Sequence, residues 1–181
     1  ESWRTIPGPI LRNNVYLGEV YDARCEVPNW SQPECDETAW QTVSIASTAL
    51  GELRAQAQPP IRQTATITPI AISQPKSGVY IFDLGQNIAG FAQLQVRGAR
   101  GTSVKMRFGE LLYPDGTLNV MTTVCGQIKK PNVGGPGAPS VAEQSDVYIL
   151  RGSDKGQPPE IFTPRFTYHG FRFVEVTGYP G

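Results

Sequence analysis

The chain has 181 residues, and its 16 lysines and arginines balance its 16 aspartates and glutamates, so the formal charge is zero. This balance argues against a nucleic-acid-binding protein, because such proteins neutralise phosphates with a basic surface. No apolar run approaches the roughly 18 residues that a membrane helix needs, so no membrane partner is expected. Nineteen glycines, 16 prolines and a charged fraction of only 18% favour a β-rich, loop-rich domain.

The hydrophobic pattern along the chain has a period of two, which predicts strands bounded by turn residues. The predicted elements follow in chain order: two short strands around a polar hinge in 9–26, at most a helical turn in 49–57, a β-branched run at 61–72 with an edge or bulge at Pro69, and strands at 78–85, 90–98, 102–112, 145–152 and 170–178. Residues 126–144 are rich in glycine and proline and predict a long surface loop. Together these elements predict a single all-β domain, an antiparallel sandwich.

Three cysteines are present, Cys25, Cys35 and Cys125. Cys25 and Cys35 flank a short turn-rich segment and are predicted to form a disulfide, with Cys125 free; three reduced thiols are the alternative. Neither a C-x-x-C motif nor a second histidine is available for a zinc site. The tripeptide Asn29-Trp30-Ser31 is a formal N-glycosylation sequon and weakly supports secretion.

Catalytic chemistry finds little support in the residues. A Ser-His-Asp triad would need His169, and the G-x-S-x-G motif does not occur. Carboxylate pairs for glycoside hydrolysis are available without a motif: Glu19 with Asp22, Asp36 with Glu37, and Asp83 with Glu110. The simpler hypothesis is that Glu19, Asp22 and Arg24 satisfy one another and the nearby backbone.

Asn13 and Asn14 are adjacent and directly precede an apolar strand. Both side chains can approach one ion only if the backbone turns there, because neighbours on an extended strand point to opposite faces. Amide and carbonyl oxygens are ligands suited to Ca²⁺. The aromatic faces on which a sugar ring could stack come from Trp3, Trp30, Trp40, Tyr16 and Tyr21.

A family resemblance is carried by six segments: YLGEVYDAR (16–24), NWSQPECDETAW (29–40), QPPIR (58–62), the run from FDLGQNIAGF to DGTL (82–118), SDVYIL (145–150) and PRFTYHGFRFVEVTGYPG (164–181). They resemble the accessory β-domain of glycoside hydrolase family 78, the α-L-rhamnosidases. In particular, they are similar to its jelly-roll domain, which in some members is a family-67 carbohydrate-binding module, a calcium-dependent binder of L-rhamnose. The insertion at 126–146 looks more like the fungal members than the bacterial ones.

The resemblance implies a site. An adjacent acid–amide pair that holds calcium in the family falls on Asn13 and Asn14, so one charge is missing here. A backbone carbonyl of Pro59 or Pro60 would help to hold the ion. Trp40 is the expected aromatic beside the sugar. Six further motif residues are expected to be structural: Asp83, Gln86, Asn87, Tyr168, His169 and Arg172.

The resemblance also implies a function. We expect residues 1–181 to be a single jelly-roll carbohydrate-binding domain, lectin-like, monomeric, secreted and of fungal type. It would be non-catalytic and calcium-dependent, and its ligand would be terminal L-rhamnose on plant cell-wall glycans. The helical barrel that carries the catalytic carboxylates of the family does not match any part of these residues. A structural accessory domain without binding activity is the alternative, and a self-contained glycosidase is a third and weaker one.

Overall fold

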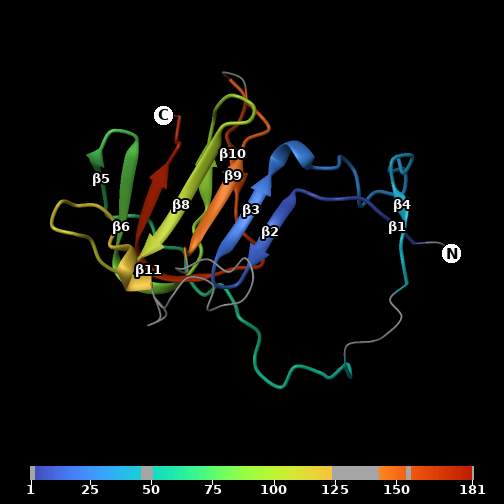
Figure 1. The fold of residues 1–181 in the computed structure, drawn as a ribbon, viewed down its shortest axis with the longest axis horizontal. Coiled ribbons are helices and arrows are strands. Elements are labelled where there is room, and N and C mark those ends of the chain that lie inside the picture. Colours follow the sequence, from blue (N-terminus) through green and yellow to red (C-terminus); the bar gives the residue numbers. More distant parts are fainter. Residues whose placement is uncertain (1–2, 46–50, 124–142, 154–155, 181) are drawn as a thin grey trace, which may run out of the picture.

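The computed structural model describes residues 3–45, 51–123, 143–153 and 156–180 (Figure 1). Within these ranges the chain forms strands and two short 3₁₀ turns, η1 (Ala23–Cys25) and η2 (Val120–Thr123), and no α-helix. The strands are β1 (Arg4–Thr5), β2 (Ile10–Asn14), β3 (Gly18–Asp22), β4 (Gln41–Thr42), β5 (Ala71–Lys76), β6 (Val79–Gly90), β7 (Leu94–Val96), β8 (Ser103–Gly109), β9 (Ser145–Ile149), β10 (Glu160–Phe162) and β11 (His169–Thr177). None of the described helical turns is long and apolar enough to cross a membrane.

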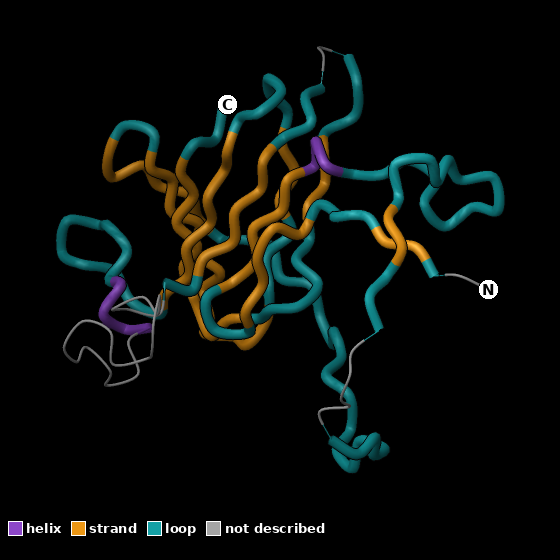
Figure 2. Tube along the Cα trace, turned by 45° about the vertical axis from the view of Figure 1, so that its right-hand side comes forward, coloured by secondary structure: helices purple, strands orange, loops and turns teal. Residues whose placement is uncertain are grey.

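The main layer is a seven-stranded sheet in the order β2-β3-β9-β8-β11-β6-β5. The pair β3–β9 is parallel, whereas the other described pairs of this sheet are antiparallel. Strands β7 and β10 form a second, two-stranded sheet, and β1 and β4 form a third. Figure 2 shows β1 and β4 set apart from the main sheet, on the N-terminal side. The expected all-β sandwich is confirmed, with one parallel pair that the sequence did not predict.

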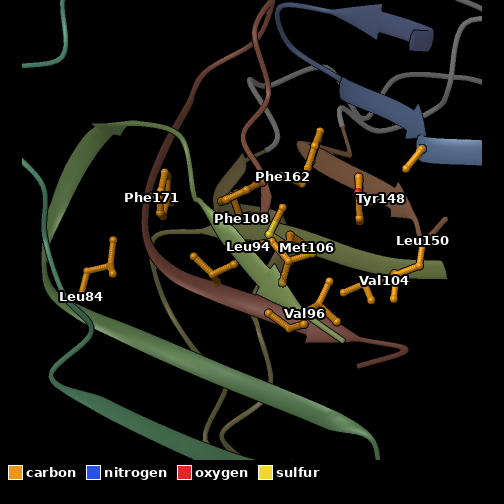
Figure 3. Packing of buried hydrophobic residues seen from close by; sticks show 13 residues of the cluster. Leu84, Leu94, Val96, Val104, Met106, Phe108, Tyr148, Leu150, Phe162 and Phe171 are labelled. Atoms are coloured by element: carbon orange, nitrogen blue, oxygen red, sulfur yellow. The ribbon is translucent and has the colours of Figure 1, made fainter. Parts of the chain in front are cut away.

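The core lies between the main sheet and the β7–β10 pair (Figure 3). Leu94, Val96 and Phe162 from the smaller sheet share one buried cluster with Phe108 and Phe171 from the larger one. Phe162 of the smaller sheet is buried, and its ring stacks on that of Tyr148 of the larger sheet with the centroids 5.0 Å apart. Removing a side chain of this kind costs about 3–5 kcal/mol, so this packing holds the two layers together.

A large bulge interrupts the pairing of β6 with β11. Phe173 pairs with Asp83, but Phe171 pairs with Ile88, so the backbone between Asp83 and Ile88 leaves the ladder. Gly85 has φ +78 at this point, a conformation that side chains with a Cβ rarely adopt. The D-L-G-Q-N motif therefore encodes a bulge in a core strand.

Several sequence expectations need correction. Residues 61–70 form no strand, and the edge strand of the sheet is β5. The irregular pairing of β5 with β6 lies between Ser73 and Lys76, so the proline at the irregularity is Pro75 and not Pro69. Because 51–66 is exposed throughout and buries no apolar face, its β-branched residues have nothing to pair with. The described part of 49–57 is not helical, and β1, β4 and β10 were not predicted. Most of the 126–144 loop lies outside the described residues.

The predicted disulfide is wrong. Cys25 and Cys35 are free thiols, and Cys125 lies outside the described residues. Cys25 ends η1, whereas the segment before Cys35 closes on itself through two successive turns. In these turns Gln32 N donates to Asn29 O at 2.8 Å and Cys35 N donates to Gln32 O at 3.2 Å. Backbone hydrogen bonds rather than a covalent bridge therefore shape this loop.

Candidate carbohydrate-binding site

Asn13 and Asn14 end β2, immediately before the turn into β3. The side-chain oxygen of Asn14 accepts hydrogen bonds from the backbone N–H groups of Tyr16 at 2.9 Å and Leu17 at 3.2 Å. This is the local bonding by which asparagine stabilises a turn. The Asn13 side chain is exposed and has no hydrogen-bond partner among the described residues. One amide of the predicted pair is therefore structural, and the other is open to a ligand.

The turn is anchored to the rest of the main sheet. Ser145 N donates to Leu17 O at 3.0 Å, and Glu19 N donates to the Asp146 carboxylate at 2.9 Å. Gly18 has φ +103, and a Cβ on this residue would overlap the carbonyl of Ser145. Only glycine permits this close approach, so the asparagine pair sits on a rigid part of the fold.

Three exposed aromatic side chains lie in the turn or in a segment that is hydrogen-bonded to it. Tyr16 is 70% exposed, Phe166 59% and Tyr168 43%. The Thr167 hydroxyl donates to Val15 O at 3.3 Å, which brings this segment against the turn. Thr167 itself is buried, whereas its neighbours Phe166 and Tyr168 are exposed. The sequence analysis expected Tyr168 to be structural, whereas its side chain is exposed, and it did not single out Phe166. The alternation in F-T-Y-H was the available signal.

The other predicted site residues lie on separate segments. Trp40 directly precedes β4, and its indole Nε1 is buried without an acceptor among the described residues. Pro59 and Pro60 lie in the exposed segment that runs away from the main sheet in Figures 1 and 2. Asn13 and Asn14 are both paired residues of β2, so their side chains point to opposite faces of the sheet. The structure shows no contact between either of them and Trp40, Pro59 or Pro60.

The fit of these residues to calcium is partial. The described residues contain no group of three or more His, Cys, Asp or Glu that could hold a metal ion. A calcium ion at the turn would therefore depend on neutral amide and carbonyl oxygens, which bind it weakly without a charged ligand. The Asn14 oxygen would also have to share its lone pairs with two backbone N–H groups. Asn13 is the better ligand of the two.

A buried polar cluster lies behind the turn. Nε2 of His169 lies 3.3 Å from Oδ1 of Asp146, and the imidazole stacks on Phe108 with ring centroids 4.2 Å apart. The Glu19 carboxylate accepts from the backbone N–H groups of Arg165 and Phe166 at 3.2 and 3.4 Å. Burial raises the pKa of Glu19 above its usual value, against the effect of these two hydrogen bonds. The cluster is closed to solvent, so it is structural, as expected for His169.

Two of the other motif residues, Asp83 and Arg172, are bound to each other. Arg172 donates from Nε and Nη2 to the two carboxylate oxygens of Asp83, both at 2.8 Å, as expected for structural residues. Asp22 and Arg24 pair in the same way, at 2.8 and 2.7 Å, which confirms the simpler hypothesis for them. Glu19 does not join that pair, because it points to the opposite side, toward Arg165.

Two family models match this chain. The model described as "Bacterial alpha-L-rhamnosidase concanavalin-like domain" matches residues 73–181, and that described as "Alpha-L-rhamnosidase N-terminal domain" matches residues 1–65. The chain belongs to the α-L-rhamnosidase concanavalin-like domain family. Strands β2 and β3, from the part matched by the N-terminal model, complete the sheet formed by the concanavalin-like part.

Relatives of this domain are whole α-L-rhamnosidases. That of Streptomyces avermitilis is 40% identical over 181 residues, which is 99% of this chain and 16% of the relative. Its crystal structure with L-rhamnose matches 99% of this chain with a TM-score of 0.83. The α-L-rhamnosidase of Aspergillus terreus matches with a TM-score of 0.79 at 28% identity, and this chain covers 18% of it. The chain thus spans about one sixth of the length of these enzymes.

Proposed function

We propose that this domain binds L-rhamnose through the turn between β2 and β3, as a calcium-dependent module of the family-67 type. The observation that supports the proposal is that an amide without a hydrogen-bond partner among the described residues, Asn13, and three exposed aromatic side chains lie on the segments joined at one rigid turn. Aromatic faces suit the C–H face of a sugar ring, while an amide can both donate to and accept from its hydroxyls. The relative from Streptomyces avermitilis was crystallised with L-rhamnose, which is the ligand we infer for this chain.

In this proposal Asn13 is the main calcium ligand, and Asn14 and a backbone carbonyl of Pro59 or Pro60 are the other protein ligands. Two sugar hydroxyls would supply further oxygens, so ion and sugar would stabilise each other's binding. Such coupling is reciprocal: calcium should tighten rhamnose binding by the factor by which rhamnose tightens calcium binding. Trp40 is the proposed aromatic partner from the resemblance, whereas Tyr16, Phe166 and Tyr168 are the ones that lie at the turn.

The biological setting is part of the same proposal. We infer a secreted, monomeric domain of fungal type that carries no catalytic activity and directs an α-L-rhamnosidase to terminal rhamnose on plant cell-wall glycans. Several of its described carboxylates are buried or bound to neighbours, which supports a non-catalytic role. Glu19 and Asp83 are the clearest cases. The second candidate function is a structural accessory domain, favoured by the bound state of the Asn14 oxygen.

The test is calorimetric titration of the chain with L-rhamnose, with calcium and with a chelator. A monosaccharide offers few atoms, so a Kd on the order of 10 µM to 1 mM is expected. Asn13→Ala should abolish binding without changing the circular dichroism, whereas Asn87→Ala, which removes an exposed amide bonded to Glu110, should leave it unchanged. If chelator does not change the affinity, calcium has no part in the site. If no heat of binding is seen at all, the structural role is correct.

A parallel assay covers catalysis. The chain should not hydrolyse an aryl α-L-rhamnoside faster than buffer does. Turnover that is lost on replacing Glu110 by Gln would instead support the glycosidase alternative.

A further inference from the structure

The loop at 26–40, between η1 and β4, carries a sequence motif that the carbohydrate site does not use. Asn29-Trp30-Ser31 fits the pattern Asn-x-Ser/Thr, whose middle residue is any residue except proline. Each of the other asparagines in the chain lacks a serine or threonine two positions later. The motif therefore singles out one asparagine, and the structure shows whether its side chain has room for a bulky group.

The tripeptide lies on the surface, and all three of its residues are exposed. The side chain of Trp30 is 67% exposed and belongs to neither buried cluster of the described residues. The Asn29 side chain has no hydrogen-bond partner in the described part of the chain. A group attached to Asn29 would therefore displace no described side-chain contact of the fold.

The backbone of Asn29 has a structural task of its own. Its carbonyl accepts a hydrogen bond from Gln32 N at 2.8 Å, and its φ of +57 lies in the left-handed region, which asparagine tolerates better than most residues. The simpler hypothesis is that Asn29 serves only this turn. Its side chain, however, differs from that of Asn14, whose oxygen accepts from Tyr16 N. Asn29 forms its turn through the backbone alone, so its amide nitrogen stays available.

The loop is also remote from the proposed rhamnose site. Strand β3 begins at the asparagine turn with Gly18 and ends at Asp22, and η1 and the 26–40 loop follow from that far end. The five residues of β3 span roughly 17 Å. Figures 1 and 2 both show the chain running from η1 toward β4, away from the main sheet. A bulky group at Asn29 would therefore leave the β2–β3 turn open to its ligand.

We propose that Asn29 is an N-glycosylation site when the chain passes through a eukaryotic secretory pathway. In the transfer, Nδ2 of Asn29 forms a bond to C1 of the N-acetylglucosamine in a lipid-linked oligosaccharide, the lipid diphosphate leaves and one amide proton is released. The hydrophilic glycan then lies beside the exposed indole of Trp30 and increases the solubility of this loop. The inference rests on the secretion that is part of the proposed function, and it does not depend on rhamnose or calcium binding.

The test is to express residues 1–181 in yeast behind a cleavable signal peptide. The mass is measured for all chains, secreted or retained, from which the signal peptide has been removed. We expect a population that is heavier by one N-linked oligosaccharide. Peptide-N-glycosidase should return this population to the unmodified size. Because this enzyme hydrolyses the amide bond, the peptide digest should then show an aspartate in place of Asn29.

Substitutions separate the acceptor from the turn. Asn29→Gly suits a positive φ, so it keeps the turn and should abolish the heavier population. Ser31→Ala should also abolish it, whereas Ser31→Thr preserves the motif and should keep the glycan. Asn87→Gln is the matched control, because it replaces an exposed asparagine that is followed by Ile88 and Ala89. Its glycan content should equal that of the parent.

Each remaining outcome counts against the proposal. A parent chain that carries no glycan after removal of its signal peptide would overturn it. Sugar that resists peptide-N-glycosidase would be O-linked, and glycan retained in Asn29→Gly would lie on another residue. Titration with L-rhamnose tells this proposal apart from the binding proposal. Chains with and without the glycan should bind equally, and Asn13→Ala should lose rhamnose binding while its glycan content stays unchanged.

Discussion

The imidazole Nε2 of His169 lies 3.3 Å from Oδ1 of Asp146, and neither side chain is exposed to solvent. The same carboxylate oxygen accepts a hydrogen bond from Glu19 N, so it joins β9 to β3 and to the start of β11. A single buried acceptor thereby ties the turn that bears Asn13 and Asn14 to the core of the sandwich.

Replacing that acceptor should be costly. Asp146→Ala leaves the Glu19 N–H and the His169 ring without their partner in a buried place, so we expect a loss of about 2–3 kcal/mol in the free energy of unfolding. Urea denaturation measures this directly. Glu52→Ala, which breaks an exposed ion pair with Arg54, is the control and should change stability by less than about 0.5 kcal/mol. Equal effects of the two substitutions would contradict the importance of the buried acceptor.

The carboxyl of Glu19 should make stability fall as pH rises. Its pKa in the folded state is raised by burial above the usual 4.5, so the folded protein holds this proton more tightly than the unfolded chain does. The contribution is fully present below pH 4.5 and is lost as pH rises through the folded-state pKa. Glu19→Gln keeps an oxygen for the N–H groups of Arg165 and Phe166 and removes the titration. We expect urea unfolding across pH 4–8 to show that the free energy of unfolding of the variant rises relative to that of the parent as pH rises. A difference between the two that stays constant with pH would refute this.

The pair Asp83–Arg172 predicts the opposite dependence on pH. Arg172 lowers the pKa of Asp83 below its usual 3.8. The pair therefore stabilises the fold fully above pH 3.8, and this stabilisation is lost as pH falls through the lowered pKa. Arg172→Gln should therefore be less stable than the parent at pH 7, and the difference between their free energies of unfolding should become smaller at low pH. Because the pair is partly exposed, the effect should also shrink at high salt. Acid titration followed by tryptophan fluorescence checks this, and a gap that persists at pH 2 would count against the ion pair.

Gly18 should tolerate no side chain. Gly18→Ala places a Cβ against the Ser145 carbonyl at a backbone φ of +103. The strain alone should lower the free energy of unfolding by about 1–3 kcal/mol. Gly8→Ala is the matched control, because a Cβ there meets nothing within 4 Å. Thermal unfolding of the two variants should show a clear drop in Tm only for Gly18→Ala. If both behave alike, the turn is more adaptable than its close approach to β9 implies.

The sequence by itself determined the all-β class and most of the core strands. The period-two alternation before and after the D-L-G-Q-N motif, and again in the segment that begins at His169, is strong because one face of each strand is buried. The same reasoning failed at 61–70, where β-branched residues occur without a neighbouring strand to cover them. Propensity describes a residue's fit to a half-buried sheet, and it does not create the sheet.

Only the tertiary structure decided what lies at each end of β3. The parallel pairing of β3 with β9 joins residues more than a hundred positions apart, and no local pattern encodes that contact. It brings Arg151 next to Arg24, at the ends of the two strands. Hydrogen bonds from the 165–167 segment to Glu19 and to Val15 O bring Phe166 and Tyr168 toward the asparagine turn. The state of Asn14 was also invisible in sequence, because whether an amide bonds its own backbone or a ligand depends on the turn that follows it. Residue types are local properties of the chain, whereas the grouping of side chains at a site follows from long-range strand pairing.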